Sequence, residues 1–396
     1  MSKILLAVLS FCWFPYLLKG QPVRNSLLSG ELVSQHIVDT IPISVEHNLI
    51  FLTVYIDQKP RKFLLDTGAP TTLSASLQHE LKYDTLFKGT LIDVHGTSDS
   101  ASFVKVTAFS VGKLEFRNVP SAVLNLRNSF LGCFGIDGII GGNTLQHLVC
   151  KFDIRSRQII FSDGPSITPA SKPIPITLDN QSSPYLKINP GPRANEELLF
   201  DTGYTGLYSL CNRNYQFFIS RRRLKNTELA KGKGNSTFGL YGSGTPTQLY
   251  LLKLRYIKVN NGRITKPIIS TSSDRNSKLG AELFTYGTVT IDYRHKAFWF
   301  QPYQQKVNAA NPGTWGIEPT SINGRICVGV VWSGTPAEKA GLSYGQPILK
   351  VNGFQLSDVT LCNMFTISWE IQSELTLEVE VDDEIRSIKL TKAFYK

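Results

Sequence analysis

The chain has 396 residues, 42% of them hydrophobic and 18% charged, which is an ordinary globular composition with enough apolar residues for two or three domains. The formal net charge is +11, but the basic residues are scattered, and their densest run, at 221–223, lacks the stacking aromatic residues of a nucleic-acid-binding surface. We therefore expect no nucleic-acid partner, and the many glycines and prolines favour short strands and tight turns over long helices.

The first predicted element is a signal peptide over residues 1–20. Lys3 precedes an apolar run that ends near Leu18, and a short positive start before an apolar core is typical of a secretory signal. The run is shorter than the ~18 residues of a membrane span, and Pro15 interrupts it. We expect cleavage near Gly20 and export to the periplasm, the cell surface or the extracellular space, with a retained anchor as the alternative.

Two breaks divide the rest of the chain into three blocks. Four prolines between residues 165 and 175 predict a linker at 164–175. A polar stretch that ends in Asn-Pro predicts a second break at 304–312. The predicted domains therefore cover residues 35–163, 176–303 and 313–396.

The first two blocks repeat each other. Each contains an apolar strand that ends in Asp-Thr-Gly, at residues 63–68 in the first block and 198–203 in the second. Each then contains a hydrophobic-Gly motif, which ends at Gly141 or Gly280, and a further apolar strand pair at a matching interval. Such agreement over whole blocks favours duplication of one β-rich unit.

A weaker repeat predicts a hairpin tip in each block, because glycine supplies the backbone conformation of a tight turn. The two tips are His95-Gly96-Thr97 and Tyr241-Gly242-Ser243. Just before the second tip, Gly232-Lys233-Gly234 lacks the remaining glycine of a dinucleotide-binding motif, and we interpret it as a flexible basic loop.

Cysteine and histidine usage predicts no metal site and no cofactor. Beyond the signal peptide, five cysteines show no Cys-x-x-Cys pair and no metal-ligand spacing: Cys133, Cys150, Cys211, Cys327 and Cys362. The six histidines form no His-Glu-x-x-His motif, and no Gly-x-Ser-x-Gly motif occurs. We expect mostly buried cysteines with at most a disulfide or two.

The paired loops predict a two-carboxylate site. Two lobes related by a pseudo-twofold axis would place Asp66 and Asp201 face to face, and such a pair holds one proton because both carboxyls cannot easily ionise. The ionised partner can take a proton from water while the protonated partner polarises a peptide carbonyl. The titration belongs to the pair, so the proton is assigned to neither residue. This arrangement predicts peptide-bond hydrolysis without a covalent intermediate.

The residues beside the aspartates suit the same role. Gly68 and Gly203 let the backbone turn tightly and approach the carboxylates closely. The hydroxyls of Thr67 and Thr202 can brace the loop of the opposite lobe.

Residues 35–303 resemble the aspartic peptidases of the retropepsin and pepsin type. The resemblance rests on Leu-Leu-Asp-Thr-Gly-Ala at 64–69, on Ile-Ile-Gly at 139–141 and on the second Asp-Thr-Gly loop. It implies a mainly β fold with two homologous acid-protease β-barrel lobes in one chain, a monomer that cuts a peptide or protein substrate, and catalytic Asp66 and Asp201. It also implies a hairpin flap, for which the candidates are His95, Gly96, Tyr241 and Gly242.

Two residues depart from the family pattern. Tyr204 stands where pepsin-like enzymes have Ser or Thr, and it would crowd the second loop. Lys278 replaces the first hydrophobic residue of the motif that ends at Gly280. Both motivate an alternative, a secreted peptide-binding protein with weak or no catalysis that uses the cleft and a groove in the third block.

The third block resembles a PDZ domain. Gly-Thr-Pro-Ala-Glu-Lys-Ala-Gly-Leu at 334–342 is followed by a strand that ends in Asn-Gly, and a helix is expected at about 357–371. Alternating apolar residues at 375–381 predict a strand, Asp-Asp a turn, and the last strand ends near Leu390. The resemblance implies a groove that binds a peptide end, with Trp315, Gly316 and Ile317 as candidates. A domain that only packs on the peptidase lobes is the alternative.

Overall fold

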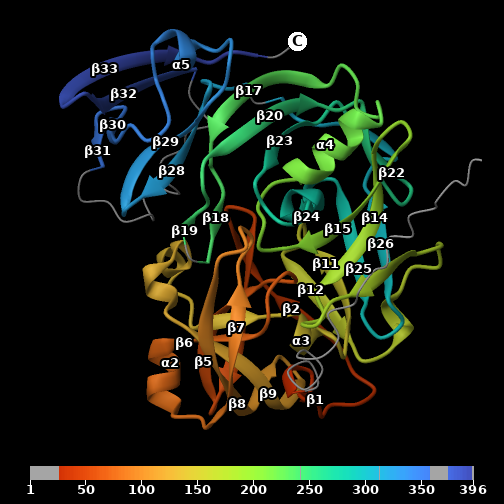
Figure 1. Ribbon diagram of the computed structural model, residues 1–396. Coiled ribbons are helices and arrows are strands. Elements are labelled where there is room, and N and C mark those ends of the chain that lie inside the picture. The colour runs from red at the N-terminus through yellow and green to blue at the C-terminus, as the bar shows by residue number, and fades with distance from the viewer. Residues whose placement is uncertain (1–25, 241, 312, 357–372, 395–396) are drawn as a thin grey trace, which may run out of the picture.

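The computed structural model describes residues 26–240, 242–311, 313–356 and 373–394 (Figure 1). The predicted signal peptide, the predicted helix at 357–371 and the hairpin residue Tyr241 lie outside the described residues. Within them the chain is mainly β, with two large sheets and a smaller C-terminal domain.

The first large sheet has nine strands in the order β1-β9-β6-β10-β5-β4-β8-β7, with β3 paired to β4. Its strands are β1 (Glu31–Leu32), β3 (Ser44–Glu46), β4 (Leu49–Ile56), β5 (Lys59–Leu65), β6 (Thr72–Ser74), β7 (Thr85–Ile92), β8 (Ser98–Val111), β9 (Leu114–Leu124) and β10 (Gly138–Ile140). Strand β5 starts exposed and ends in three buried residues, because it enters the centre of the sheet between β4 and β10. We call this sheet and its helices the first lobe.

The second large sheet has sixteen strands and joins the first two blocks. Three of its strands come from the first block: β2 (Val38–Pro42), β11 (Val149–Asp153) and β12 (Gln158–Ser162). The others are β13 (Ile174–Leu178), β14 (Pro184–Gly191), β15 (Ala194–Asp201), β16 (Tyr208–Cys211), β17 (Glu228–Gly234), β20 (Thr247–Lys253), β21 (Tyr256–Val259), β22 (Gly262–Thr265), β23 (Ile268–Ser272), β24 (Lys278–Gly280), β25 (Gly287–Asp292), β26 (Ala297–Pro302) and β27 (Lys306–Asn308). We call the second-block part the second lobe.

The two lobes share one core. Strand β11 pairs antiparallel with β25, with Phe152 opposite Val289. The Phe152 ring stacks on Phe284, with ring centroids 5.4 Å apart, and both rings meet Phe200 edge-on. Each fully buried aromatic side chain contributes roughly 1.5–3 kcal/mol, so this cluster fixes the lobes beneath the strand that carries Asp201.

Both predicted breaks contain regular structure. The predicted linker holds a short 3-10 helix, η3 (Pro165–Ile167), and β13 begins inside it at Ile174. Within the second break, β27 pairs in parallel with β22. Proline is compatible with these elements because Pro165 occupies the first turn of its helix, where its missing N–H is not needed.

A helix follows the strand after each Asp-Thr-Gly loop, although the sequence predicted a helix only in the third block. These helices are α2 (Ala75–Leu81) and α4 (Asn212–Ser220), and shorter turns are η1 (Leu126–Asn128), η2 (Phe130–Phe134), α3 (Gly142–Leu145) and η4 (Ala281–Thr285). The Ser74 hydroxyl accepts the Leu77 N–H at 3.1 Å, which is a helix N-cap that the sequence contained.

The third domain has its own apolar core. Its elements are β28 (Ile317–Ile322), β29 (Arg325–Val331), α5 (Pro336–Lys339), β30 (Ile348–Val351), β31 (Phe354–Gln355), β32 (Glu374–Val381) and β33 (Glu384–Thr391). The predicted strand at 375–381, its turn and the last strand are confirmed by β32 and β33.

The third domain packs on the second lobe along β17 (Figure 1). A Cβ atom on Gly234 would lie 1.8 Å from the carbonyl oxygen of Gly329, and one on Gly232 would lie 2.4 Å from that of Val331. The interpretation of Gly232–Gly234 as a flexible loop is therefore wrong. These glycines form a strand whose bare backbone lets β29 approach, beside an apolar contact that includes Trp332.

Candidate active site

Both Asp-Thr-Gly loops are held by the same strand arrangement. In the first lobe, β5 runs parallel to β10 with Leu65 opposite Ile140, and β10 pairs antiparallel with β6. In the second lobe, β15 runs parallel to β24 with Phe200 opposite Leu279, and β24 pairs antiparallel with β16. Each aspartate therefore lies at the end of a buried strand, where its backbone position is fixed.

The structure brings Asp66 and Asp201 together, and each carboxyl group lies against the glycine of the opposite loop. Gly68 N–H donates to Asp66 Oδ1 at 2.8 Å, and Gly203 N–H donates to Asp201 Oδ1 at 2.9 Å. A Cβ atom on Gly203 would lie 2.5 Å from Asp66 Oδ2, and one on Gly68 would lie 2.9 Å from Asp201 Oδ1. Only glycine leaves room for the opposing carboxyl at either position.

The two threonines brace the opposite loops reciprocally. The Thr67 hydroxyl donates to the Phe200 carbonyl at 2.6 Å and accepts the Thr202 N–H at 3.1 Å. The Thr202 hydroxyl donates to the Leu65 carbonyl at 2.8 Å and accepts the Thr67 N–H at 3.0 Å. Both side chains are fully buried. Four hydrogen bonds in a dry site therefore fix the separation of the two carboxyls.

Burial, and then the adjacent carboxylate of Asp201, raise the pKa of Asp66 from its usual 3.8 to about 8. The Gly68 N–H and the charge of Lys278 oppose this rise, but they are outweighed. The pair therefore retains a proton up to about pH 8, which is the state needed for one acid and one base.

Lys278 and Tyr204, the two departures from the family pattern, contact each other. The Lys278 Nζ lies 5.1 Å from the centroid of the Tyr204 ring and 2.6 Å from Asp274 Oδ2. At the equivalent positions of the first lobe, Ala69 and Ile139 belong to an apolar cluster. A buried ammonium is costly unless it is paired, so the carboxylate and the ring face offset the charge that replaced an apolar residue.

Tyr204 supports the second loop rather than crowding it. Its N–H donates to Asp201 Oδ1 at 3.2 Å, in addition to the bond from Gly203. Its ring turns toward Gly206 and Lys278. Burial raises the pKa of the Tyr204 phenol well above its usual value, so the hydroxyl stays protonated.

His95 and Gly96 form the tip of the β7–β8 hairpin, as predicted, and this tip reaches the second lobe. The N–H of Arg275 donates to the Val94 carbonyl at 2.9 Å. Only 6% of the His95 side chain is exposed, and its Nδ1 lies 3.5 Å from Asp274 Oδ1. The hairpin therefore bridges the lobes beside the aspartates, and its role as a flap stays a prediction.

The second predicted tip lies near the first one. Strands β18 (Phe238–Gly239) and β19 (Gly242–Ser243) form a short hairpin in which Gly242 is paired with Gly239. The Gly239 backbone lies against His95, and the Ser243 hydroxyl lies 2.9 Å from that of Thr320 in the third domain. This hairpin connects the third domain to the tip of the first-lobe hairpin (Figure 1).

The predicted groove residues of the third domain lie at the start of β28. Trp315 and Ile317 are 6% and 7% exposed and belong to the domain core. The Gly316 N–H donates to the Thr314 hydroxyl at 2.9 Å, and its carbonyl accepts the Trp332 N–H at 2.8 Å. Peptide binding by this segment stays a prediction.

Three polar residues that border the site were missed from the sequence. Gln181 Nε2 donates to the Gly68 carbonyl at 2.9 Å. Burial and nearby carboxylates, including Asp201, raise the pKa of Tyr185 to about 12. Asp274 pairs with Lys278, and only this pair left a signal, two opposite charges four positions apart. Gln181 and Tyr185 lie just before and within β14, the strand that pairs with β15, and no motif in the sequence marks either residue.

The described cysteines take no part in the site. Cys133 forms a disulfide, whereas Cys150, Cys211 and Cys327 are free and buried; Cys362 lies outside the described residues. Within those ranges no cluster of three or more His, Cys, Asp and Glu side chains is arranged to hold a metal. None of the helices described has the length and apolar character needed to cross a membrane.

Comparison with known proteins gives a partial family match. The aspartyl protease family model matches residues 52–144, which contain the first Asp-Thr-Gly loop and β10. No curated protein matches the chain.

Three solved structures are similar to parts of the chain. A retropepsin-like aspartic protease from Rickettsia conorii is 19% identical, with a TM-score of 0.25, over 32% of this chain and 91% of that protein. Basic 7S globulin from soybean is 13% identical, with a TM-score of 0.40, over 67% and 94%. An aspartic proteinase from Irpex lacteus is 12% identical, with a TM-score of 0.41, over 66% and 96%. These similarities are too low to carry an argument.

Proposed function

We propose that the chain is an aspartic endopeptidase that uses Asp66 and Asp201, and the match of residues 52–144 to the aspartyl protease family model supports this proposal. The observation that carries the proposal is the pair of facing carboxyl groups, held by the reciprocal bonds of Thr67 and Thr202. The family match covers only part of the first lobe, so the facing position of Asp201 in the second lobe is the main support for a two-carboxylate site.

The reaction follows from the protonation of the pair. A water held between the carboxyls gives a proton to the ionised one and attacks the peptide carbonyl carbon. The protonated carboxyl donates to the carbonyl oxygen as it becomes negative. The same groups then return a proton to the peptide nitrogen, the C–N bond breaks, and a carboxylic acid and an amine leave.

The alternative of an inactive peptide-binding protein is less favoured. It depended on Tyr204 and Lys278, and both residues are accommodated in the second loop. Tyr204 adds a hydrogen bond to Asp201, and Lys278 is paired with Asp274. Neither residue displaces the carboxyl pair.

We also propose export, a monomeric state and a peptide-binding role for the third domain. The apolar N-terminus supports export, and so does the disulfide at Cys133, since disulfides persist in oxidising compartments. One chain supplies both aspartates, which supports a monomer. The contact between Ser243 and Thr320 supports the binding role, because it joins the third domain to the β18–β19 hairpin beside His95.

The pH profile of cleavage tests the proposed function. We expect the purified chain to cut a reduced, carboxymethylated protein in acid and at neutral pH, and to lose activity as the pH rises through about 8, where the carboxyl pair loses its shared proton. Initial rates between pH 3 and 9, followed by release of new amino termini, measure this. A rate that keeps rising above pH 8 would exclude a mechanism that needs one protonated carboxyl in the pair.

A further inference from the structure

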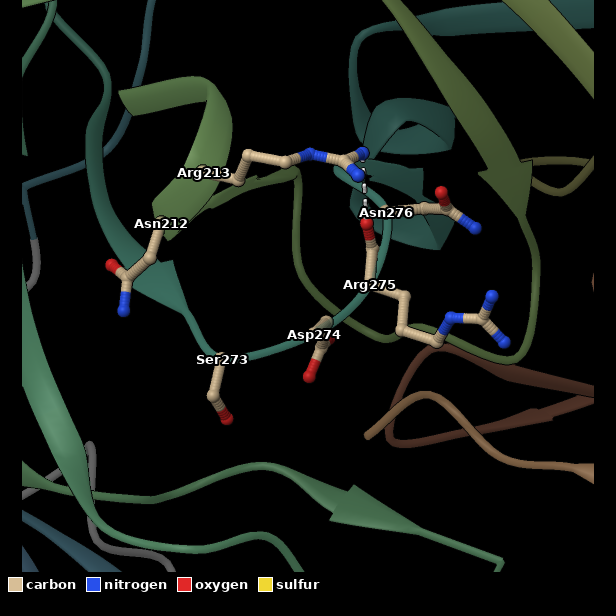
Figure 2. Close-up of a pocket in the computed structure, with 6 residues that line it drawn as sticks. All are labelled: Asn212, Arg213, Ser273, Asp274, Arg275 and Asn276. Atoms are coloured by element: carbon tan, nitrogen blue, oxygen red, sulfur yellow. Dashed lines mark hydrogen bonds between the residues drawn. The ribbon is translucent and has the colours of Figure 1, made fainter. Parts of the chain in front are cut away.

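A polar pocket of about 240 Å³ lies in the second lobe, between the start of α4 and the loop that joins β23 to β24 (Figure 2). It is lined by Asn212, Arg213, Ser273, Asp274, Arg275 and Asn276. A water occupies ~30 Å³ of liquid, so the pocket has room for a short acidic side chain together with a few waters.

The pocket adjoins the strands that position Asp201. Asn276 Nδ2 donates to the Tyr185 hydroxyl at 3.1 Å, and Tyr185 is paired with Leu199 on β15, the strand that ends at Asp201. The lining residue Asp274 is paired with Lys278 at the start of β24. The Arg275 N–H donates to the Val94 carbonyl in the tip of the β7–β8 hairpin, at 2.9 Å.

The pocket carries uncompensated positive charge. Figure 2 shows Arg275 extending from the loop, while Arg213 reaches over the loop and donates to the Arg275 carbonyl at 3.4 Å. Neither guanidinium forms an ion pair within the part of the chain that the structure describes. The acidic lining residue, Asp274, is 1% exposed and is already paired with Lys278 at 2.6 Å.

We propose that Arg213 and Arg275 form a subsite for a carboxylate of the substrate, which selects peptides with Asp or Glu close to the scissile bond. This inference rests on the proposed peptidase function, because it assigns a substrate class to the same cleft. Guanidinium groups bind carboxylates through charge-assisted hydrogen bonds. The rest of the lining, from Asn212, Ser273 and Asn276, is polar and uncharged, so it adds hydrogen bonds without opposing the charge.

Cleavage-site mapping tests the subsite. Wild-type protein should cut a proteome-derived peptide mixture with Asp or Glu enriched at one fixed position from the cut. The Arg213→Gln/Arg275→Gln variant should lose that enrichment and about tenfold in kcat/KM on acidic sites, while neutral sites are cut as before. Arg222→Gln/Lys225→Gln removes the same charge from exposed positions beyond α4 and should change nothing. An acidic preference that survives in the double arginine variant would overturn the proposal.

A peptide-binding experiment distinguishes a wrong subsite assignment from a wrong assignment of peptidase activity. The Asp201→Asn chain is titrated with fluorescent decapeptide pools that carry one fixed Glu or Gln, each with a free or an amidated C-terminus. We expect the Glu pool to bind about tenfold more tightly, regardless of the terminus, and to lose this advantage when Arg213 and Arg275 are replaced. Equal binding of the Glu and Gln pools, or a preference that follows only the free terminus, would refute a side-chain subsite even if the protein cuts peptides.

Discussion

Asp66→Asn and Asp201→Asn are each expected to lower kcat/KM on an unfolded protein roughly 10³- to 10⁴-fold, because neither amide can take a proton from water or donate one as an acid. Both variants should fold, since an amide oxygen still accepts the N–H of Gly68 or Gly203. Initial rates at pH 6, with circular dichroism as the check on folding, measure the effect.

Asp57→Asn is the matched control for both variants. Asp57 is exposed in the β4–β5 turn, where its φ of 49° suits asparagine equally well. Wild-type activity is expected for this variant. If Asp66→Asn or Asp201→Asn keeps the wild-type rate while folded, the two-carboxylate mechanism is wrong.

Gly203→Ala is expected to lower kcat/KM by about 10²-fold, because a displacement of about 1 Å in catalytic geometry costs that much. The new methyl group would lie 2.5 Å from Asp66 Oδ2, so the carboxyls must separate or the second loop must shift. Loss of stability of roughly 1–3 kcal/mol should accompany the overpacking. Rates and thermal unfolding of the same preparation measure both effects.

Gly164→Ala is the control for the added methyl group. Gly164 has an extended backbone, with φ −141°, and open space where a Cβ would stand. This variant should keep both activity and stability. Equal behaviour of the two alanine variants would mean that the carboxyls are not packed against the opposing glycines.

The candidate site was predictable from sequence because its motif is local and occurs twice. Each Asp-Thr-Gly loop follows an apolar strand, and duplication of the motif implies an axis that brings Asp66 and Asp201 together. The bracing by Thr67 and Thr202 follows from the same symmetry. Strand alternation likewise predicted β32, whose apolar residues recur at every second position, and the Asp-Asp turn after it predicted β33.

The other features of the fold and of the candidate site depend on contacts between segments that are distant in sequence. No local sequence pattern indicates that β11 pairs with strands of the second sheet. None indicates that Gly232 and Gly234 allow β29 to pack closely rather than making the segment flexible. Lys278 looked damaging because its contact with the Tyr204 ring is identified only by the fold, and the charge of Asp274 four positions earlier does not by itself show that the two residues are paired. The sequence does not distinguish Arg213 and Arg275 from the many other exposed basic residues.

The central claim, a buried carboxyl pair that shares a proton, is tested most directly by the pH dependence of stability, which needs no substrate. A carboxyl whose folded pKa is raised from 3.8 to about 8 stabilises the fold fully below pH 3.8, and this stability is lost as the pH rises toward 8. Asp66→Asn removes the dependence, because the amide is neutral at every pH.

Thermal unfolding of wild type, Asp66→Asn and Asp57→Asn should therefore be compared from pH 4 to 8. We expect the melting temperature of Asp66→Asn to rise relative to wild type across this range, by about 1 °C for each kcal/mol of stability involved, while Asp57→Asn follows wild type. A constant difference between Asp66→Asn and wild type at every pH would mean that Asp66 titrates normally and that the two aspartates do not share a proton.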